Sequence, residues 1–239
     1  MAGKRLLVAD LGVVPYGAAL ERQRGLAEDR IAGRLADDLL LLLEHPPVVT
    51  LGRGARESSM PIAPELLRRR GIEVFDIERG GDVTYHGPGQ LVGYPIFDLT
   101  QHRQDLHWFL RQIEEALIVA LGGFGIPGER RESYTGVWTA GRKIASIGIH
   151  VRQWVTWHGF ALNVTTDLTP FSLNVPCGIQ DVVMTSIAQE RGDAAAGRDL
   201  GREAREAVVE AFVRTFGFDR AETVAPPMPA TPTPAASGS

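Results

Sequence analysis

Two apolar segments joined by a very short turn constrain the fold of this chain more than any other feature. Residues Lys143–Val151 and Val155–Val164 have the pattern of strands, and the turn near Arg152-Gln153 separates them by only a few residues. Strands joined so tightly pair as antiparallel neighbours, because a parallel connection needs a dozen or more residues. The sequence therefore predicts an antiparallel hairpin inside a larger sheet.

Helices and further strands are predicted around this hairpin. The clearest helix is Asp105–Leu121, whose apolar residues recur three and four positions apart before Gly122-Gly123. Other helices are expected at Gly17–Leu35, Pro64–Arg70 and Glu203–Phe216, and strands at Leu6–Asp10, Asp38–Glu44, Val48–Leu51, Glu73–Asp76, Leu91–Leu99 and Gly136–Thr139. Pro95 suggests that its strand lies at an edge or carries a bulge. Helices mixed with hairpins favour an α+β fold over a doubly wound sheet.

Composition limits the class of protein. Apolar residues make up 44% and charged residues 23% of the chain, which is typical of soluble globular proteins. The net charge of -4 argues against a general nucleic-acid binder. The aliphatic run Leu39–Leu43 is far shorter than the ~20 residues that span a bilayer, and Met1–Asp10 has no signal-peptide core. We therefore expect a cytoplasmic protein with no nucleic-acid or membrane partner.

The chain is expected to form one domain over residues 1–221, followed by a disordered tail over residues 222–239. The tail is rich in proline, alanine and serine and carries a single charge, so it cannot build a packed core. Truncation after Ala221 is then expected to leave activity and melting temperature nearly unchanged.

The single cysteine, Cys177, is the first candidate for chemistry. One cysteine excludes an internal disulfide and a cysteine-based zinc site. Cysteine is often simply buried, and that structural interpretation stays open. However, Pro176 and Gly178 indicate a tight loop, where a thiol can be accessible and act as a nucleophile.

Lys143 is the second candidate, at the start of the predicted hairpin. Taken alone it could be an ordinary solvated lysine. The hairpin that follows interleaves small residues with bulky ones, and glycine within a strand often marks a close approach to the backbone. A slender acyl chain lying across Gly148 and Gly159 would explain this pattern, and so would simple tight packing.

The segment Arg79–Gln90 is the strongest local signal, with four glycines in twelve residues. It lacks the Gly-Lys-Ser/Thr ending of a phosphate loop and does not open a helix as a dinucleotide fingerprint does. It is either a ligand-contacting loop or a hairpin turn. The six histidines form no metal-ligand pair on a helix, and no Gly-x-Ser-x-Gly elbow is present, so we assign neither a metal nor serine-hydrolase chemistry.

Together these motifs resemble the signature of the lipoyl(octanoyl) transferase family, over roughly residues 5–216. The resemblance is carried by Arg79-Gly80-Gly81, Thr84-Tyr85-His86, Gly89-Gln90, Tyr94, Lys143-Ile-Ala-Ser-Ile-Gly148, His158-Gly-Phe-Ala-Leu-Asn163 and Asn174-Val-Pro-Cys-Gly178. It implies an α+β fold with a mixed, largely antiparallel sheet and flanking helices, related to the catalytic domains of biotin and lipoate protein ligases.

The resemblance also implies a reaction, in which an octanoyl or lipoyl group passes from acyl carrier protein to a lysine of a lipoyl domain. Acceptors would be the lipoyl domains of 2-oxoacid dehydrogenase complexes and the glycine cleavage H protein, and no cofactor is implied. Cys177 would carry the acyl group as a thioester, and Lys143 would lower its pKa. The implied substrate-binding residues are Arg79, Gly80, Gly81, Asp82, Val83, Thr84, Tyr85, His86, Ser146, Ile147, Gly148, Gly159, Phe160 and Ala161.

Three other functions are compatible with parts of the sequence. An ATP-dependent lipoate or biotin ligase of the same fold would need nucleotide and no cysteine. A thioesterase would pass the acyl group to water, and a scaffold that binds acyl carrier protein would form no covalent adduct. The acyl acceptor, the need for ATP and the presence of an adduct distinguish these possibilities.

Overall fold

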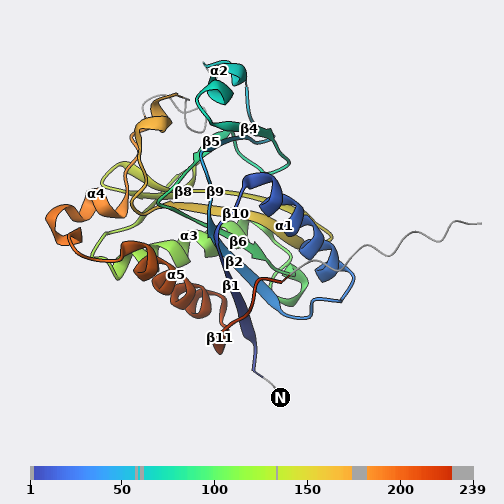
Figure 1. Ribbon diagram of the computed structural model, residues 1–239. Helices are drawn as coiled ribbons and strands as arrows, with labels where there is room; N and C mark the ends of the chain where they lie inside the picture. The colour runs from blue at the N-terminus through green and yellow to red at the C-terminus, as the bar shows by residue number, and fades with distance from the viewer. Residues whose placement is uncertain (1–2, 57–58, 60–61, 133, 174–181, 228–239) are drawn as a thin grey trace, which may run out of the picture.

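A mixed sheet forms the centre of the computed structural model, which describes residues 3–56, 59, 62–132, 134–173 and 182–227. Within these residues the large sheet has eight strands in the order β11-β1-β2-β6-β10-β9-β8-β7. A second sheet has three strands in the order β4-β3-β5. With helix α2, the small sheet lies beyond one end of the large sheet, at the top of Figure 1.

The bounds of the elements are as follows. The large sheet contains β1 (Arg5–Val13), β2 (Asp38–Glu44), β6 (Gln90–Ile96), β7 (Glu129–Arg131), β8 (Tyr134–Thr139), β9 (Arg142–Arg152), β10 (Val155–Asn163) and β11 (Arg220–Thr223). The small sheet contains β3 (Val48–Leu51), β4 (Glu73–Asp76) and β5 (Val83–His86). The helices are α1 (Tyr16–Ile31), α2 (Pro64–Arg69), α3 (Leu106–Gly122), α4 (Ile187–Arg191) and α5 (Leu200–Phe216).

The predicted hairpin is confirmed. Strands β9 and β10 pair as antiparallel neighbours from Arg152 opposite Val155 to Ala145 opposite Leu162. In the described sheet, β1 makes the parallel pairs, with β2 on one side and β11 on the other, and the remaining neighbours are antiparallel. The expected α+β fold with a mixed, largely antiparallel sheet is therefore correct.

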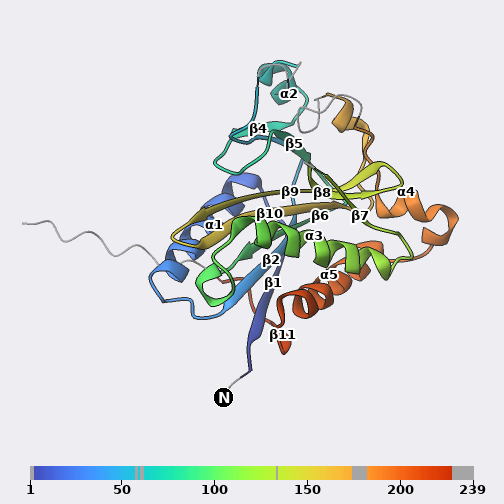
Figure 2. The same ribbon diagram turned by 180° about the vertical axis from the view of Figure 1, so that it is seen from behind.

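Helices cover both faces of the large sheet. Helices α3 and α5 pack side by side on one face, and α1 lies on the other (Figures 1 and 2). Strand β2 shows why its sequence is a continuous aliphatic run: Leu40 and Leu42 belong to the hydrophobic cluster under α3 and α5, whereas Leu39, Leu41 and Leu43 belong to the cluster under α1. A strand buried on both faces has no polar alternation.

Pro95 lies at the centre of the sheet, so the expectation of an edge strand is wrong. Strand β6 is hydrogen-bonded between β2 and β10, and continuing its register with β10 places Pro95 opposite His158. His158 adopts a φ of 58°, and its backbone N–H donates to Gln23 Oε1 at 2.8 Å. The missing N–H of proline is thus accommodated by an irregular residue in the partner strand rather than by an edge.

The expected tail begins too early. Glu222 and Thr223 belong to β11 and pair with Leu7 and Val8 of β1, although the sequence places them in a disordered segment. Arg5 Nη1 also donates to Glu222 Oε2 at 2.9 Å. The four residues of β11 are exposed or half-exposed and are held by backbone pairing, so they carry no apolar pattern and composition alone misses this strand.

No helix among the described residues is both long enough and apolar enough to cross a membrane.

Because β11 pairs with β1, truncation after Ala221 should destabilise the protein. It removes the hydrogen bond from Val224 N–H to Val8 O, 2.9 Å long, together with the last two β11 pairs. We expect a loss of about 1–2 kcal/mol and a fall in Tm of a few degrees, measured by thermal denaturation. Truncation after Pro227 is the matched control, because it leaves β11 intact. Equal melting temperatures for the two shortened chains would contradict a stabilising role for β11.

Candidate active site

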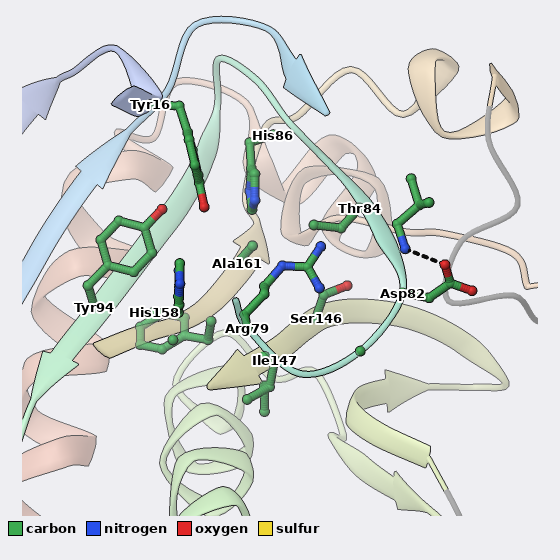
Figure 3. Close-up of a pocket in the computed structure, with 15 residues that line it drawn as sticks. Tyr16, Arg79, Asp82, Thr84, His86, Tyr94, Ser146, Ile147, His158 and Ala161 are labelled. Carbon is green, nitrogen blue, oxygen red and sulfur yellow. Dashed lines mark hydrogen bonds between the residues drawn. The ribbon is translucent and has the colours of Figure 1, made fainter. Parts of the chain in front are cut away.

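A cavity lies between the Gly-rich segment and the β9–β10 hairpin (Figure 3). Its lining joins most of the substrate-binding residues predicted from the sequence with three that were not predicted, Tyr16, Tyr94 and His158. The full set is Tyr16, Arg79, Gly81, Asp82, Val83, Thr84, His86, Tyr94, Ser146, Ile147, Gly148, His158, Gly159, Phe160 and Ala161. In Figure 3, Tyr16, Tyr94 and His158 lie at one end of the cavity, and Asp82, Thr84 and Ser146 lie at the other.

The Gly-rich segment rests directly on strand β9. Gly80 N–H donates to Ile149 O at 3.0 Å. A Cβ atom at Gly148 would lie 2.8 Å from Gly80 O, which is closer than real Cβ contacts. The close approach predicted for Gly148 is therefore made by the chain's own loop.

Gly159 is required for a different reason. A Cβ atom there would lie 1.9 Å from Gly93 O in the neighbouring strand β6. Gly148 and Gly159 also pair with each other across β9 and β10. Tight packing inside the protein thus accounts for both glycines, and a larger residue at either position would disturb the fold before it changed any ligand preference.

Arg79 fixes the Gly-rich segment to the small sheet. Its side chain is largely buried, and Nη2 donates to Thr50 O at 2.8 Å and to Thr50 Oγ1 at 2.9 Å. At the other end of the same loop, Ser59 Oγ donates to Asp82 Oδ2 at 2.7 Å. The turn from Arg79 to Asp82 is held at both ends and forms part of the cavity wall.

Two buried histidines lie next to the tyrosines of the cavity: His86 lines the cavity beside Tyr16, and His45 is bonded to Tyr94 without lining it. His45 Nδ1 donates to Val14 O at 2.7 Å, so Nε2 accepts from Tyr94 OH, also at 2.7 Å. Burial lowers the pKa of His45 to about 4 and that of His86 to about 3. Both rings are therefore neutral near pH 7.

A chain of hydrogen bonds links His86 to the strand that carries Lys143. His86 Nδ1 donates to Gln90 Oε1 at 2.7 Å, and Gln90 Nε2 donates to Asn163 Oδ1 at 2.9 Å. Asn163 Nδ2 donates to Thr185 O at 3.0 Å, and Thr185 N–H donates to Lys143 O at 2.9 Å. Residues of three sequence motifs are thus connected through Thr185.

Lys143 is not a solvated lysine. It is only 1% exposed, and its Nζ lies 5.1 Å from the centre of the Trp138 ring. The β8–β9 pairing shifts register just before Trp138, which places Lys143 opposite this ring. Such irregularities often redirect a side chain next to a functional site.

A second cavity, of about 240 Å³, lies beside Lys143. It shares four lining residues with the first cavity, and α3 contributes Leu106 and Leu110 to it. The shared residues are Gly81, Asp82, Ile147 and Gly148. The two cavities therefore meet at the contact between the Gly-rich segment and β9.

Three predicted residues need separate comment. Cys177 lies outside the described residues, which stop at Leu173 and resume at Val182. Gly80 lines the second cavity, not the first. Tyr85 lines neither, because its ring packs against Phe171 at a centroid distance of 5.5 Å.

The three unpredicted lining residues differ in whether a sequence motif contains them. Tyr94 and His158 lie inside the motifs that carried the resemblance, so these motifs could have identified them as site residues. Tyr16 begins α1, far from any motif, and only tertiary packing brings it to the cavity. Among the described residues, no group of three His, Cys, Asp or Glu side chains is placed to hold a metal ion.

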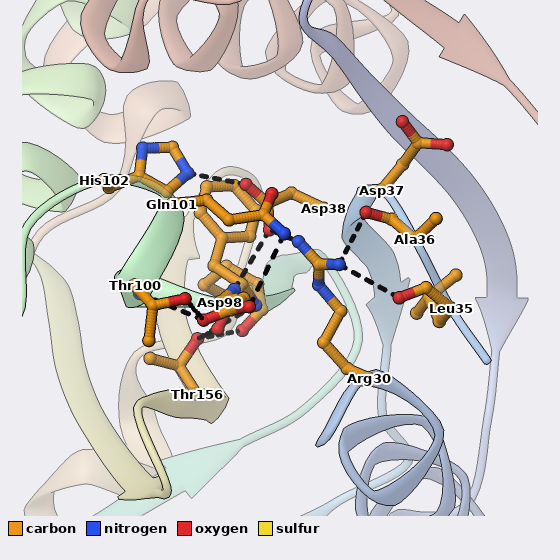
Figure 4. A network of polar contacts seen from close by, with 12 residues as sticks. Arg30, Leu35, Ala36, Asp37, Asp38, Asp98, Thr100, Gln101, His102 and Thr156 are labelled. Atoms are coloured by element: carbon orange, nitrogen blue, oxygen red, sulfur yellow. Dashed lines mark hydrogen bonds and ion pairs between the residues drawn. The ribbon is translucent and has the colours of Figure 1, made fainter. Parts of the chain in front are cut away.

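A separate polar network at the beginning of β2 serves the fold (Figure 4). Asp38 Oδ1 accepts from Arg30 Nη2 at 2.9 Å and from Asp98 N–H at 3.0 Å, and Asp38 Oδ2 accepts from His102 Nε2 at 2.5 Å. Burial raises the pKa of Asp38, but these hydrogen bonds outweigh it and leave the pKa below its usual range. None of these four residues lines either cavity.

Comparisons with known proteins first identify the class. Residues 15–216 match the family model for the lipoyl protein ligase A/B catalytic domain. The fold resembles a lipoate-protein ligase A solved with ATP, with a TM-score of 0.68 at 17% identity, covering 93% of this chain and 89% of that one. A bi-partite lipoate protein ligase from Thermoplasma acidophilum gives a TM-score of 0.67 at 19% identity, covering 94% and 88%. The fold is that of a lipoyl protein ligase catalytic domain.

Sequence relatives narrow the class. The chain is 50% identical to the octanoyltransferase of Gloeobacter violaceus, covering 89% of this chain and 91% of that protein. It is 49% identical to the octanoyltransferase of a Nostoc species, covering 89% and 93%. The chain belongs to the octanoyltransferase family, as its motifs predicted.

The buried histidines make a prediction about pH and stability. Their folded pKa values lie below the unfolded value of about 6.5, so the unfolded chain takes up protons first as the pH falls. From pH 7 to 5, His45 and His86 should each lower the free energy of unfolding by about 2 kcal/mol, measured by urea denaturation. His86→Gln should reduce this loss, whereas His107→Gln, at an exposed position of α3, should not. A free energy of unfolding that does not change over this range would rule out buried neutral histidines.

Proposed function

We propose that this protein transfers an octanoyl group from acyl carrier protein to a lysine of a lipoyl domain, through a thioester on Cys177. The membership of the octanoyltransferase family carries the proposal. The cavity at the motif residues and the buried Lys143 support it. We further propose that the protein works in the cytoplasm and serves lipoyl domains of 2-oxoacid dehydrogenase complexes and the glycine cleavage H protein.

The reaction consists of two acyl transfers. The Cys177 thiolate attacks the acyl-carrier thioester, forms a new thioester and releases the phosphopantetheine thiol, which takes a proton. The ε-amine of the acceptor lysine then attacks this thioester, loses a proton and forms an amide, and the cysteine leaves as thiolate. Because a thioester already stores the free energy that amide formation needs, the cycle requires no nucleotide.

In this proposal Lys143 activates the thiol. An ordinary thiol has a pKa near 8.5, so about 3% is thiolate at pH 7, and a nearby cation favours the charged form. The chain that follows Cys177 supports this pairing: Val183, six residues later, accepts a hydrogen bond from Lys143 N–H at 2.8 Å. Lys143 can also relay the proton that the acceptor amine loses.

The acyl chain is assigned to the first cavity. Ile147, Phe160 and Ala161 provide apolar surface there. Since Lys143 lines only the second cavity, the carbonyl end would lie where the two cavities meet, and the methyl end would point toward Tyr16 and Tyr94. Each methylene that is buried contributes about 0.8 kcal/mol to binding.

An ATP-dependent ligase is the main alternative, because the structural neighbours include lipoate ligases. Those neighbours are only 17% and 19% identical, so they support the fold and not the reaction. The octanoyltransferases at 50% and 49% identity favour transfer from a thioester. Product formation without ATP, with lysine and not water as acceptor, separates the proposed reaction from both a ligase and a thioesterase.

The first test asks whether Cys177 becomes covalently acylated. Incubation with octanoyl-acyl carrier protein should add one octanoyl group to the wild type and none to Cys177→Ala, measured by intact-protein mass spectrometry. Addition of a lipoyl domain should then remove the group from the enzyme and leave it on the domain. A stable adduct on Cys177→Ala, or an ATP requirement, would overturn the proposal.

The second test concerns Lys143. Lys143→Ala should move the pH midpoint of Cys177 alkylation by iodoacetamide upward by about one unit, and slow alkylation at pH 7 about tenfold. Because the chain has one cysteine, every alkylation event reports on Cys177. Lys143→Arg should keep part of the thiolate stabilisation but lose the proton relay, since arginine stays charged. An alkylation profile identical to that of the wild type would remove Lys143 from thiol activation.

A further inference from the structure

Strand β8 forms a fitted slot for the Lys143 side chain. A Cβ atom at Gly136 would lie 2.6 Å from Ala145 O in β9 and 2.9 Å from Lys143 Cε, so glycine lets β8 approach both the β9 backbone and the stem of this lysine. Two residues along, Trp138 presents its ring to Lys143 Nζ at 5.1 Å. A Cβ atom at Gly136 would also lie 3.4 Å from Trp138 Cη2, so Gly136 and Trp138 together bound one side of the slot.

The backbone of Gly136 is held in place by a residue of helix α3. Its backbone N–H donates to Glu114 Oε1 at 3.1 Å, and Glu114, on α3, is fully buried. The other carboxylate oxygen, Oε2, accepts from Arg111 Nη1 at 2.6 Å and from Arg130 Nε at 3.2 Å. A buried carboxylate with three donors has no freedom to rotate away, so the β8 backbone is fixed relative to α3.

We infer that Glu114 is a positioning residue for Lys143. Glu114 lines neither cavity, and its carboxylate binds Gly136 N–H, Arg111 and Arg130. It acts by holding the Gly136 backbone at the distance that seats the lysine stem beside the Trp138 ring. This inference rests on the proposed role of Lys143 in thiol activation.

Carboxylates on this helix also offer a matched control. Glu115, the next residue, is half-exposed, and its Oε2 accepts from Arg130 Nη2 at 2.6 Å. Removal of Glu115 therefore costs Arg130 an ion pair without changing the support of Gly136. A difference between the two positions separates the backbone contact from the general charge of this surface.

The experiment measures the pH profile of Cys177 alkylation in full-length variants. Glu114→Ala should raise the pH midpoint in the same direction as Lys143→Ala and slow alkylation at pH 7 by about threefold. Glu114→Gln keeps an oxygen acceptor for Gly136 N–H and should restore most of the rate. Glu115→Ala should match the wild type. A wild-type profile in folded Glu114→Ala protein would overturn the inference.

A double substitution excludes a purely structural effect. If Glu114 acts through Lys143, then Glu114→Ala combined with Lys143→Ala should alkylate no more slowly than Lys143→Ala alone. Additive losses would contradict the inference. If Glu114→Ala does not fold, Glu114→Asp replaces it, because it keeps a charge for both arginines but withdraws the acceptor from Gly136. An unchanged profile in folded Glu114→Asp would then overturn the inference.

The outcomes also separate this inference from the proposed function. A wild-type profile in Lys143→Ala would refute the role of Lys143 and with it the inference. A shifted profile in Lys143→Ala with an unshifted one in the Glu114 variants would refute only the positioning role.

Discussion

The site depends on one close contact between two backbones, that of the Gly-rich segment and that of strand β9. The hydrogen bond from Gly80 N–H to Ile149 O brings the segments together, and the missing side chain at Gly148 allows the approach. Arg79 can then reach Thr50 in the small sheet. The contact thus joins the small sheet to the large one, and both cavities open beside it.

A buried lysine is the second constraint, because taking an ammonium out of water is costly. The structure offsets this cost with an aromatic ring and a strand that is irregular where the lysine sits. The backbone N–H and C=O of Lys143 are also both bonded to one segment, to Val183 O and to Thr185 N–H. The strand position of Lys143 is therefore fixed by the segment that follows Cys177 as well as by its own hairpin.

Much of the fold could be predicted from local pattern. The bounds of β2, β3 and β4 were predicted as the structure has them, since short apolar runs with turn residues at each end are diagnostic. Strand β5 lies inside the Gly-rich segment and was missed, because glycines obscure the strand pattern. The central position of Pro95 was also missed, because the compensating irregularity lies at His158, in another strand.

The candidate site was predictable mainly through its motifs. The predicted substrate-binding residues meet at the cavities, with Tyr85 as the exception. The burial of Lys143 was not predictable, because a lysine at the start of a strand normally faces water and the slot is built by β8. The assignments of function to individual residues, Cys177 above all, remain predictions for the experiments to decide.

The pairing of β11 with β1 has a consequence for synthesis of the chain. Arg5 and Glu222 are bonded although they are 217 residues apart, so β1 leaves the ribosome long before its outer neighbour. In that interval β1 can pair with β2 on one side, while its other edge exposes unpaired backbone groups. Nascent chains on the same mRNA could pair with one another through this exposed edge. Slow translation of the last segment would therefore lengthen the period in which they can aggregate.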